Sequence, residues 1–224
     1  MPRLSRFHSR LLVLALLCAI SSAAHASDVV LDFKDVAIPG GTNSAPFFVY
    51  DAKGFSLTAV NPPSGFLTGF VVNGPKSSSW AGAIGVVASA PAGPPSNFIQ
   101  LVPDDNQPFA VLSIDLARDV LSDPAPTVTF TGVRPDLTTV TESFTVSTPS
   151  GVRAFQTFAF TGFSNLISLN WEQPDPAEGM HQFSNIHLQT VPEPSVLSFA
   201  VAAVLILALR FEIPFARRPR MLRL

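Results

Sequence analysis

Cysteine is nearly absent from this chain of 224 residues, and the one copy, Cys18, lies within an apolar run near the N-terminus. That run has the features of a segment that is removed on export, so we expect the mature protein to contain no cysteine. Disulfide bonds and a thiol nucleophile are then both excluded.

Catalytic signatures are also missing. The sequence has no Gly-x-Ser-x-Gly elbow, no phosphate-binding loop and no His-Glu-x-x-His motif. His181 and His187 lie six positions apart in one predicted strand, on the same nominal face, and lack a third ligand for zinc. The acidic pairs Asp104-Asp105 and Glu172 with Asp175 have the composition of a glycosidase pair, but we interpret them as solubilising residues of Pro-rich turns. We therefore expect no enzymatic activity, and a glycan-active hydrolase is the remote alternative.

Basic residues are scarce in the middle of the chain. Between residues 27 and 191, six Lys and Arg stand against fourteen Asp and Glu, which gives this region a net charge of −8. The remaining basic residues lie in the first ten positions and from Arg210 onward. A strongly acidic central region argues against DNA or RNA as a partner.

The N-terminus has three parts in the order of a secretory signal peptide. Arg3, Arg6 and Arg10 precede the apolar run 11–20, and the small residues of Ala24-His25-Ala26 follow it. A run of ten apolar residues is half of the roughly 20 that a spanning helix needs. We predict a signal peptide over 1–26, recognised by signal peptidase through Ala24 and Ala26 and cut after Ala26. The alternatives are a buried N-terminal helix or an uncleaved anchor.

The C-terminus also has three parts. Pro192-Glu193-Pro194 is followed by an apolar run over 196–209. Five arginines then form a basic tail over 210–224: Arg210, Arg217, Arg218, Arg220 and Arg223. Two prolines keep the first part extended and out of helices and strands. The run of fourteen spans roughly 21 Å as a helix, so an ordinary core helix is the alternative.

This arrangement over 191–224 resembles the PEP-CTERM sorting domain. The resemblance implies that an exosortase reads Pro192, Glu193 and Pro194, that the helix lodges in inner-membrane lipid, and that the basic tail stays cytoplasmic, as the positive-inside rule also favours. We therefore expect an exported protein, anchored in the inner membrane and then found at the cell envelope or outside the cell after processing.

Between these segments the periodicity is that of β-strands, with short stretches rich in Val, Phe, Thr and Ile separated by Gly and Pro turns. We predict strands at 29–36, 47–50, 55–60, 66–73, 84–88, 98–102, 109–117, 127–133, 138–146, 154–161, 166–172 and 182–189. Many short antiparallel strands in one domain, residues 27–190, favour an all-β fold with two sheets packed as a jelly-roll sandwich. A closed barrel is the alternative.

Short segments over the second half of this domain, from Pro108-Phe109 to Asn185-Ile186, resemble the exported domain of many PEP-CTERM proteins. Such domains are similar in outline to galactose-binding-like and carbohydrate-binding sandwiches. The resemblance implies a non-enzymatic protein of the envelope or extracellular matrix that binds exopolysaccharide. The alternative is a structural matrix or biofilm protein that associates with itself through sheet edges.

The same resemblance implies a structural calcium ion between the first and last strands, where Asp32, Asp35 and Asn185 would supply oxygen ligands. Ser184 stands where many relatives would have an acidic residue, so we expect no cofactor and no metal site. Tyr50, Trp80 and Trp171 carry rings able to stack on a sugar. Trp80 follows three serines in a predicted loop, which makes it the better surface candidate.

Overall fold

The computed structural model describes residues 26–37, 47–60, 69–88, 97–119, 125–147, 152–173 and 179–190. Ala26 is exposed at the start of this part of the chain. Ala24, the sorting motif Pro192-Glu193-Pro194, the apolar helix and the arginines of the basic tail lie outside the described residues, so the predictions made for them stand as predictions. No helix in the described ranges is long and apolar enough to cross a bilayer. The contact pattern groups Ser27–Val191 into one compact unit.

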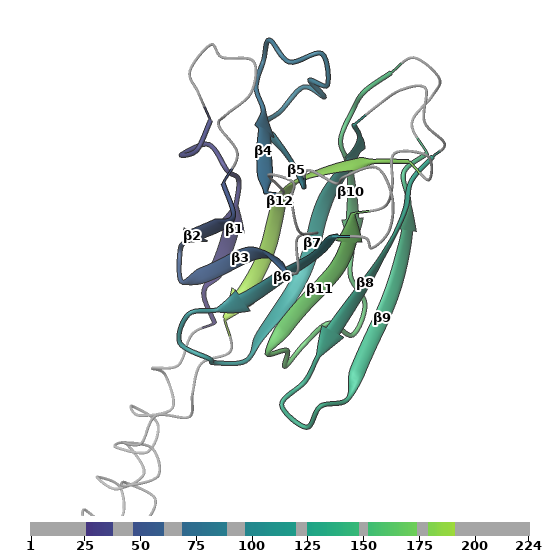
Figure 1. Ribbon diagram of the computed structural model, residues 1–224. Helices are drawn as coiled ribbons and strands as arrows, with labels where there is room; N and C mark the ends of the chain where they lie inside the picture. The colour runs from purple at the N-terminus through teal and green to yellow at the C-terminus, as the bar shows by residue number, and fades with distance from the viewer. Residues whose placement is uncertain are drawn as a thin grey trace, which may run out of the picture. The chain divides into compact units, whose positions relative to one another are not determined.

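Two antiparallel sheets make up this unit, and Figure 1 labels their strands. Sheet A has the order β10 (Gln156–Ala159), β7 (Phe109–Arg118), β12 (His181–Thr190), β5 (Gly85–Ala88) and β4 (Phe70–Asn73), and β1 (Asp28–Leu31) also pairs with β12. Sheet B has the order β2 (Val49–Ala52), β3 (Phe55–Val60), β6 (Asn97–Pro103), β11 (Ser168–Gln173), β8 (Thr127–Val133) and β9 (Thr139–Thr145).

All twelve predicted strands are present, and 55–60 and 127–133 have the predicted bounds. The prediction of an all-β fold with two antiparallel sheets is confirmed. The first strand ends at Leu31, short of the predicted residue 36. Phe33 adopts φ 55°, a left-handed conformation outside the β region, and the chain turns after it.

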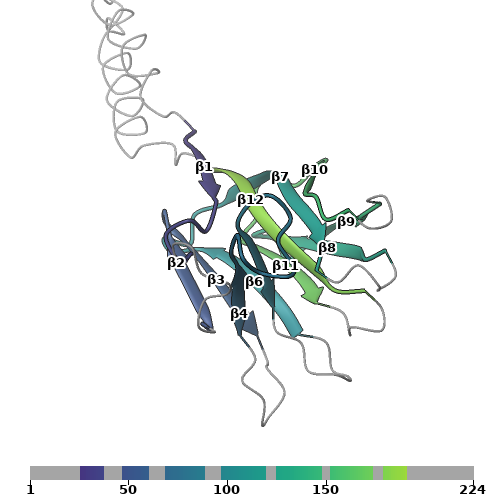
Figure 2. The same ribbon diagram turned by 90° about the horizontal axis from the view of Figure 1, so that it is seen from above.

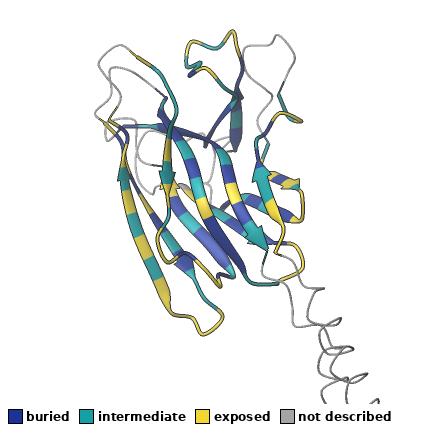
Figure 3. Cartoon of the chain, turned by 180° about the vertical axis from the view of Figure 1, so that it is seen from behind, coloured by how far each residue is buried: buried dark blue, intermediate teal, exposed yellow. Residues whose placement is uncertain are grey.

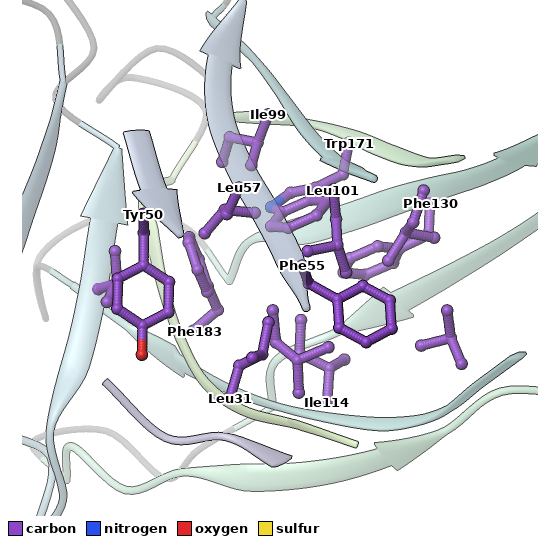
Figure 4. Close-up of a cluster of buried hydrophobic side chains, with 14 of the residues drawn as sticks. Leu31, Tyr50, Phe55, Leu57, Ile99, Leu101, Ile114, Phe130, Trp171 and Phe183 are labelled. Carbon is purple, nitrogen blue, oxygen red and sulfur yellow. The ribbon is translucent and has the colours of Figure 1, made fainter. Parts of the chain in front are cut away.

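The hydrophobic core lies between the two sheets, and Figure 4 shows part of it. Trp171 of sheet B meets Phe183 of sheet A edge to face, with ring centroids 5.2 Å apart. Phe55 and Phe109 make a similar contact across the layer at 5.3 Å. Each fully buried side chain of this size stabilises the fold by roughly 1.5–3 kcal/mol relative to an exposed one. In each strand that carries one of these aromatic residues, the side of the strand on which the ring lies is therefore the side that faces the core.

One side of the sandwich is closed by aromatic rings. Phe144 of β9 stacks on Phe158 of β10, with ring centroids 4.9 Å apart. Side chains therefore join an edge strand of sheet B to an edge strand of sheet A. Figure 3 shows the alternation of exposed and partly buried residues along one such border strand, and β9 has this alternation throughout. No described strand pairs with the outer border of β9.

The two ends of the domain meet. β1 pairs with β12 from Asp28 opposite Gln189 to Leu31 opposite Ile186, and Figure 2 shows the two strands together from above. Beyond this pairing, Thr190 N donates to Ser27 O at 3.1 Å, and the two hydroxyls are 2.9 Å apart. The chain therefore enters and leaves the described unit at one place.

Candidate functional site

The outer face of sheet A is covered at one end by the segment between β4 and β5. Gln182 of β12 is fully buried there, and its Nε2 donates to Ser79 O at 2.8 Å and to Arg118 O at 3.0 Å. Asn73 Nδ2 donates to Asp119 Oδ1 at 3.0 Å and to Gln182 Oε1 at 3.3 Å. Because these polar groups are buried and hydrogen-bonded to one another, this end of sheet A is structural.

The three residues that the resemblance implies as calcium ligands each have a different protein partner. Lys34 Nζ donates to Asp32 Oδ2 at 3.0 Å, while Lys53 Nζ lies 3.7 Å from Asp32 Oδ1. Partial burial acts to raise the pKa of Asp32, but the hydrogen bond and charges of these lysines outweigh it, and the pKa lies below its usual value. Tyr50 Oη donates to Asp35 Oδ1 at 2.8 Å. Burial, together with this contact, raises the pKa of the Tyr50 phenol.

Asn185 lies on β12, and its Nδ2 donates to Asp115 Oδ2 at 2.7 Å. Thr157 donates to the other oxygen of Asp115 at 2.6 Å. The described residues contain no group of three His, Cys, Asp or Glu side chains placed to hold a metal ion. We therefore infer no calcium site from this part of the molecule.

The prediction that His181 and His187 share a face is wrong. His181 is fully buried, whereas His187 is exposed. The pairing of β12 with β7 shifts register between Ser184 and His187, and Asn185 has φ 42°, so the strand bulges there and its alternation is reset. Neither ring nitrogen of His181 has a hydrogen-bond partner within the described residues, and burial lowers the pKa of this ring to about 3.

The three rings expected to stack on sugar are mostly unavailable. Trp171 is 1% exposed and Tyr50 is 3% exposed, and both belong to the core. Trp80 is half-buried in the segment that covers sheet A, where its backbone N–H donates to Ser77 O at 3.1 Å. Tyr50 and Trp171 are thus part of the core, and Trp80 is the one of the three that keeps some exposed surface.

The outer face of sheet B carries an aromatic ring that sequence reasoning missed. In β6, Ile99 and Leu101 are fully buried, so the alternate residues Phe98 and Gln100 face outward, and Phe98 is 43% exposed. In β11, Leu169 and Trp171 are buried in the same way, which turns Asn170 and Glu172 outward. The signal was the polar Gln100 between two aliphatic residues, since it marks the wet face of the strand.

These four side chains form one group because β6 and β11 are neighbours. Phe98 pairs with Glu172 and Gln100 pairs with Asn170. Neighbouring strands lie about 4.8 Å apart, and residues two apart on one strand are separated by about 6.8 Å, so all four side chains fall within the width of a small ligand. Asn170 Nδ2 donates to Ser168 Oγ at 3.1 Å. Within the described part of the chain, Gln100 and Glu172 have no hydrogen-bond partner for their side chains. We call Phe98, Gln100, Asn170 and Glu172 the sheet B site.

The sheet B site has the chemistry of a sugar-binding surface. An apolar ring can cover the C–H face of a pyranose, while two amides and a carboxylate supply donors and acceptors for hydroxyl groups around its rim. Glu172 belongs to a strand, which corrects its interpretation as a turn residue. Asp104 and Asp105 do lie in a turn and are exposed, as predicted, and Asp175 lies outside the described residues.

Comparison with known proteins gives no family. No protein-family profile matches the chain, and no curated protein matches it. Among solved structures, it is similar to a family 29 carbohydrate-binding module from Piromyces equi at 8% identity and a TM-score of 0.40, covering 78% of this chain and 98% of that one. A mutant family 29 module gives 10% identity and a TM-score of 0.37, covering 74% and 93%. TM-scores this low establish neither a shared fold nor a shared ligand.

Proposed function

We propose that this chain is an exported, non-enzymatic protein of the cell envelope or extracellular matrix, whose β-domain binds polysaccharide through the sheet B site. The observation that carries the proposal is the outward position of Phe98, 43% exposed and paired with Glu172 beside two outward amides. A single exposed ring is common on protein surfaces, so the support for binding comes from the outward amides and carboxylate that lie around this one. Bound sugar would remove that ring from water and satisfy the amides at the same time.

Export and sorting are part of the same proposal. The N-terminal and C-terminal segments support processing by signal peptidase and by an exosortase, with passage through the inner membrane. The mass of the mature protein recovered from cells tests this: loss of residues 1–26 and cleavage near Pro194 are expected. The full-length mass in the soluble cytosol would contradict it.

We also propose that the two sheets form a jelly-roll sandwich of the galactose-binding-like kind. The antiparallel pairing of the first and last strands, β1 and β12, supports this assignment. An experimental structure would test it by tracing the connections between the sheets.

A glycan array tests the binding function. The probe is the full chain in a zwitterionic detergent, because detergents with sugar headgroups would compete for the site. Phe98→Ala should reduce binding to every glycan retained by the wild type by at least about tenfold, which corresponds to about 1.4 kcal/mol.

Leu112→Ala is the matched control. Leu112 is 40% exposed, but it lies on β7 of sheet A and therefore in the other sheet from the sheet B site. We expect this variant to bind like the wild type. Equal loss in both variants, or full binding by Phe98→Ala, would contradict the proposed site.

Self-association is the second candidate function, and the free border of β9 favours it. This strand has seven residues, no proline and a single charged residue, Glu142. An unpaired strand border of this kind offers a row of backbone donors and acceptors to another chain. Silent glycan arrays together with concentration-dependent assembly would favour this function over sugar binding.

A further inference from the structure

A row of polar side chains crosses five of the six strands of sheet B on its outer face. Its members are Thr141 on β9, Thr131 on β8, Asn170 on β11, Gln100 on β6 and Thr58 on β3. Each is the direct partner of the next in the register of the sheet. Outward residues of neighbouring strands are normally mixed in kind, but here hydroxyl and amide groups follow one another across five strands. We call this set the polar row.

The length of the polar row exceeds what one sugar needs. Neighbouring strands lie about 4.8 Å apart, so five strands span roughly 19 Å between the first and last. Phe98 lies beside the row, two residues before Gln100 on the same strand. A second line of hydroxyls runs parallel to the row, because Thr129 and Ser143 pair with their oxygens 2.8 Å apart. Hydroxyl donors and acceptors thus continue from the aromatic ring to the border of the sheet.

Charge limits what can lie along this row. The six strands of sheet B contain no Lys, Arg or His, and two of their outward residues, Asp51 and Glu172, are acidic. The cations of the two adjoining turns are engaged elsewhere: Lys53 donates to Val30 O, and Arg134 donates to Gly162 O at 3.1 Å. A polymer carrying carboxylates, phosphates or sulfates would therefore meet like charge at Asp51 and Glu172, and no strand of the sheet supplies a cation to pair with it.

From these observations we infer that the ligand is an uncharged polysaccharide chain that lies across the strands along the polar row, with one sugar of the chain on Phe98. This inference rests on the proposed function and adds two properties to it: the site recognises several linked sugars, and it discriminates against anionic polymers.

Affinity for defined sugars tests both properties. The probes are cellohexaose, laminarihexaose and mannohexaose, with glucose and mannose as the matching single sugars, and alginate and polygalacturonate as anionic polymers. Each is titrated calorimetrically into the full chain in zwitterionic detergent. We expect at least one hexasaccharide to bind ten times or more tightly than its single sugar, and both anionic polymers to bind at least ten times more weakly than that hexasaccharide.

Thr131→Val isolates the row from the aromatic ring. It replaces one outward hydroxyl by a methyl group of similar size, and we expect a loss of about threefold to tenfold for the hexasaccharide, equivalent to one net hydrogen bond, with no change for the single sugar. Thr161→Val, an exposed threonine outside sheet B, is the control and should change neither.

The possible outcomes distinguish a failure of this inference from a failure of the proposed sugar-binding function. If a single sugar binds as tightly as its hexasaccharide, or an anionic polymer binds best, the extended neutral ligand is wrong. Sensitivity to Phe98→Ala would then still support sugar binding at the site. If no carbohydrate binds at all, the proposed function and this inference both fail.

Discussion

The outer faces of the two sheets use the same kinds of side chain in opposite ways. On sheet A, Asn73 and Gln182 are buried, and each makes hydrogen bonds within the described structure. On sheet B, Gln100 lies at the surface beside Phe98, and no described group pairs with its side chain. A buried amide whose donors are used stabilises the fold and has nothing left for a ligand. Availability for binding is therefore a property of the face and not of the residue type.

The largest expected effect on stability comes from removing the buried amide of Gln182 on sheet A. Gln182→Ala should lower the free energy of unfolding by about 2–4 kcal/mol, because it removes the side-chain donor to two backbone carbonyls and one of the two acceptors of the Asn73 amide. The Gln182 amide also packs directly against Gly85, because a Cβ added at Gly85 would overlap it. Chemical denaturation measures the change.

Gln100→Ala is the matched variant on sheet B and should change stability by less than about 0.5 kcal/mol. Similar losses in the two variants would remove the contrast between the faces.

A smaller effect of opposite sign is expected one residue away from Gln182. His181 is also fully buried, but on the core side, and its ring nitrogens find no partner among the described residues. His181→Leu should raise the free energy of unfolding at pH 7 by about 1–2 kcal/mol, because an unsatisfied polar group is replaced by an apolar one. A loss of stability would show that the ring has a partner, and would weaken the distinction between satisfied and unsatisfied positions of β12.

The same substitution changes the pH dependence. The folded-state pKa of His181 is about 3, well below the value of about 6.5 in an unfolded chain. The unfolded chain therefore binds the extra proton first, and stability present above pH 6.5 is lost as the pH falls toward 3. Between pH 7 and pH 5 this loss amounts to about 2 kcal/mol. We expect the free energy of unfolding of His181→Leu to lack this dependence on pH when it is measured between pH 5 and pH 7. His187→Leu, at an exposed position, should keep it.

The smallest expected effect on stability concerns the border of sheet B. Ser143→Lys places a charge at the middle of β9 and should change the free energy of unfolding by less than about 0.5 kcal/mol. If β9 pairs with a second copy, the lysine should nonetheless abolish concentration-dependent assembly in sedimentation experiments. Leu137→Lys adds the same charge at the exposed turn before β9 and serves as the control. Assembly that persists in Ser143→Lys would exclude this border as the contact.

The strands could be predicted because the pattern of Val, Phe and Thr is local, and each strand needs only its own alternation to be recognised. The site could not be predicted in the same way. Phe98 and Trp171 both lie in alternating segments, and which of them faces the core depends on the partner strands. Trp171 is buried because Phe130 and Phe183 pack against it from both sheets.

The error on the histidines has a similar cause. A period of two places His181 and His187 on one face, but the irregularity at Asn185 breaks the period. A single residue with positive φ is enough to switch the later residues of the strand to the opposite face of the sheet. Asparagine is one of the residues that tolerate such a conformation. The sequence contains an asparagine there, but many asparagines in strands cause no bulge.

The meeting of Ser27 and Thr190 has a mechanical consequence. Force applied by pulling the two ends apart would act on the β1–β12 pair at its open end and break its hydrogen bonds one after another, as a zipper opens. Force that enters through the outer face of sheet B and leaves through Thr190 alone would instead be carried along β12, which is bonded to β7 on one side and to β1 and β5 on the other. A domain tethered by one end would thus resist drag far better than a domain stretched between two.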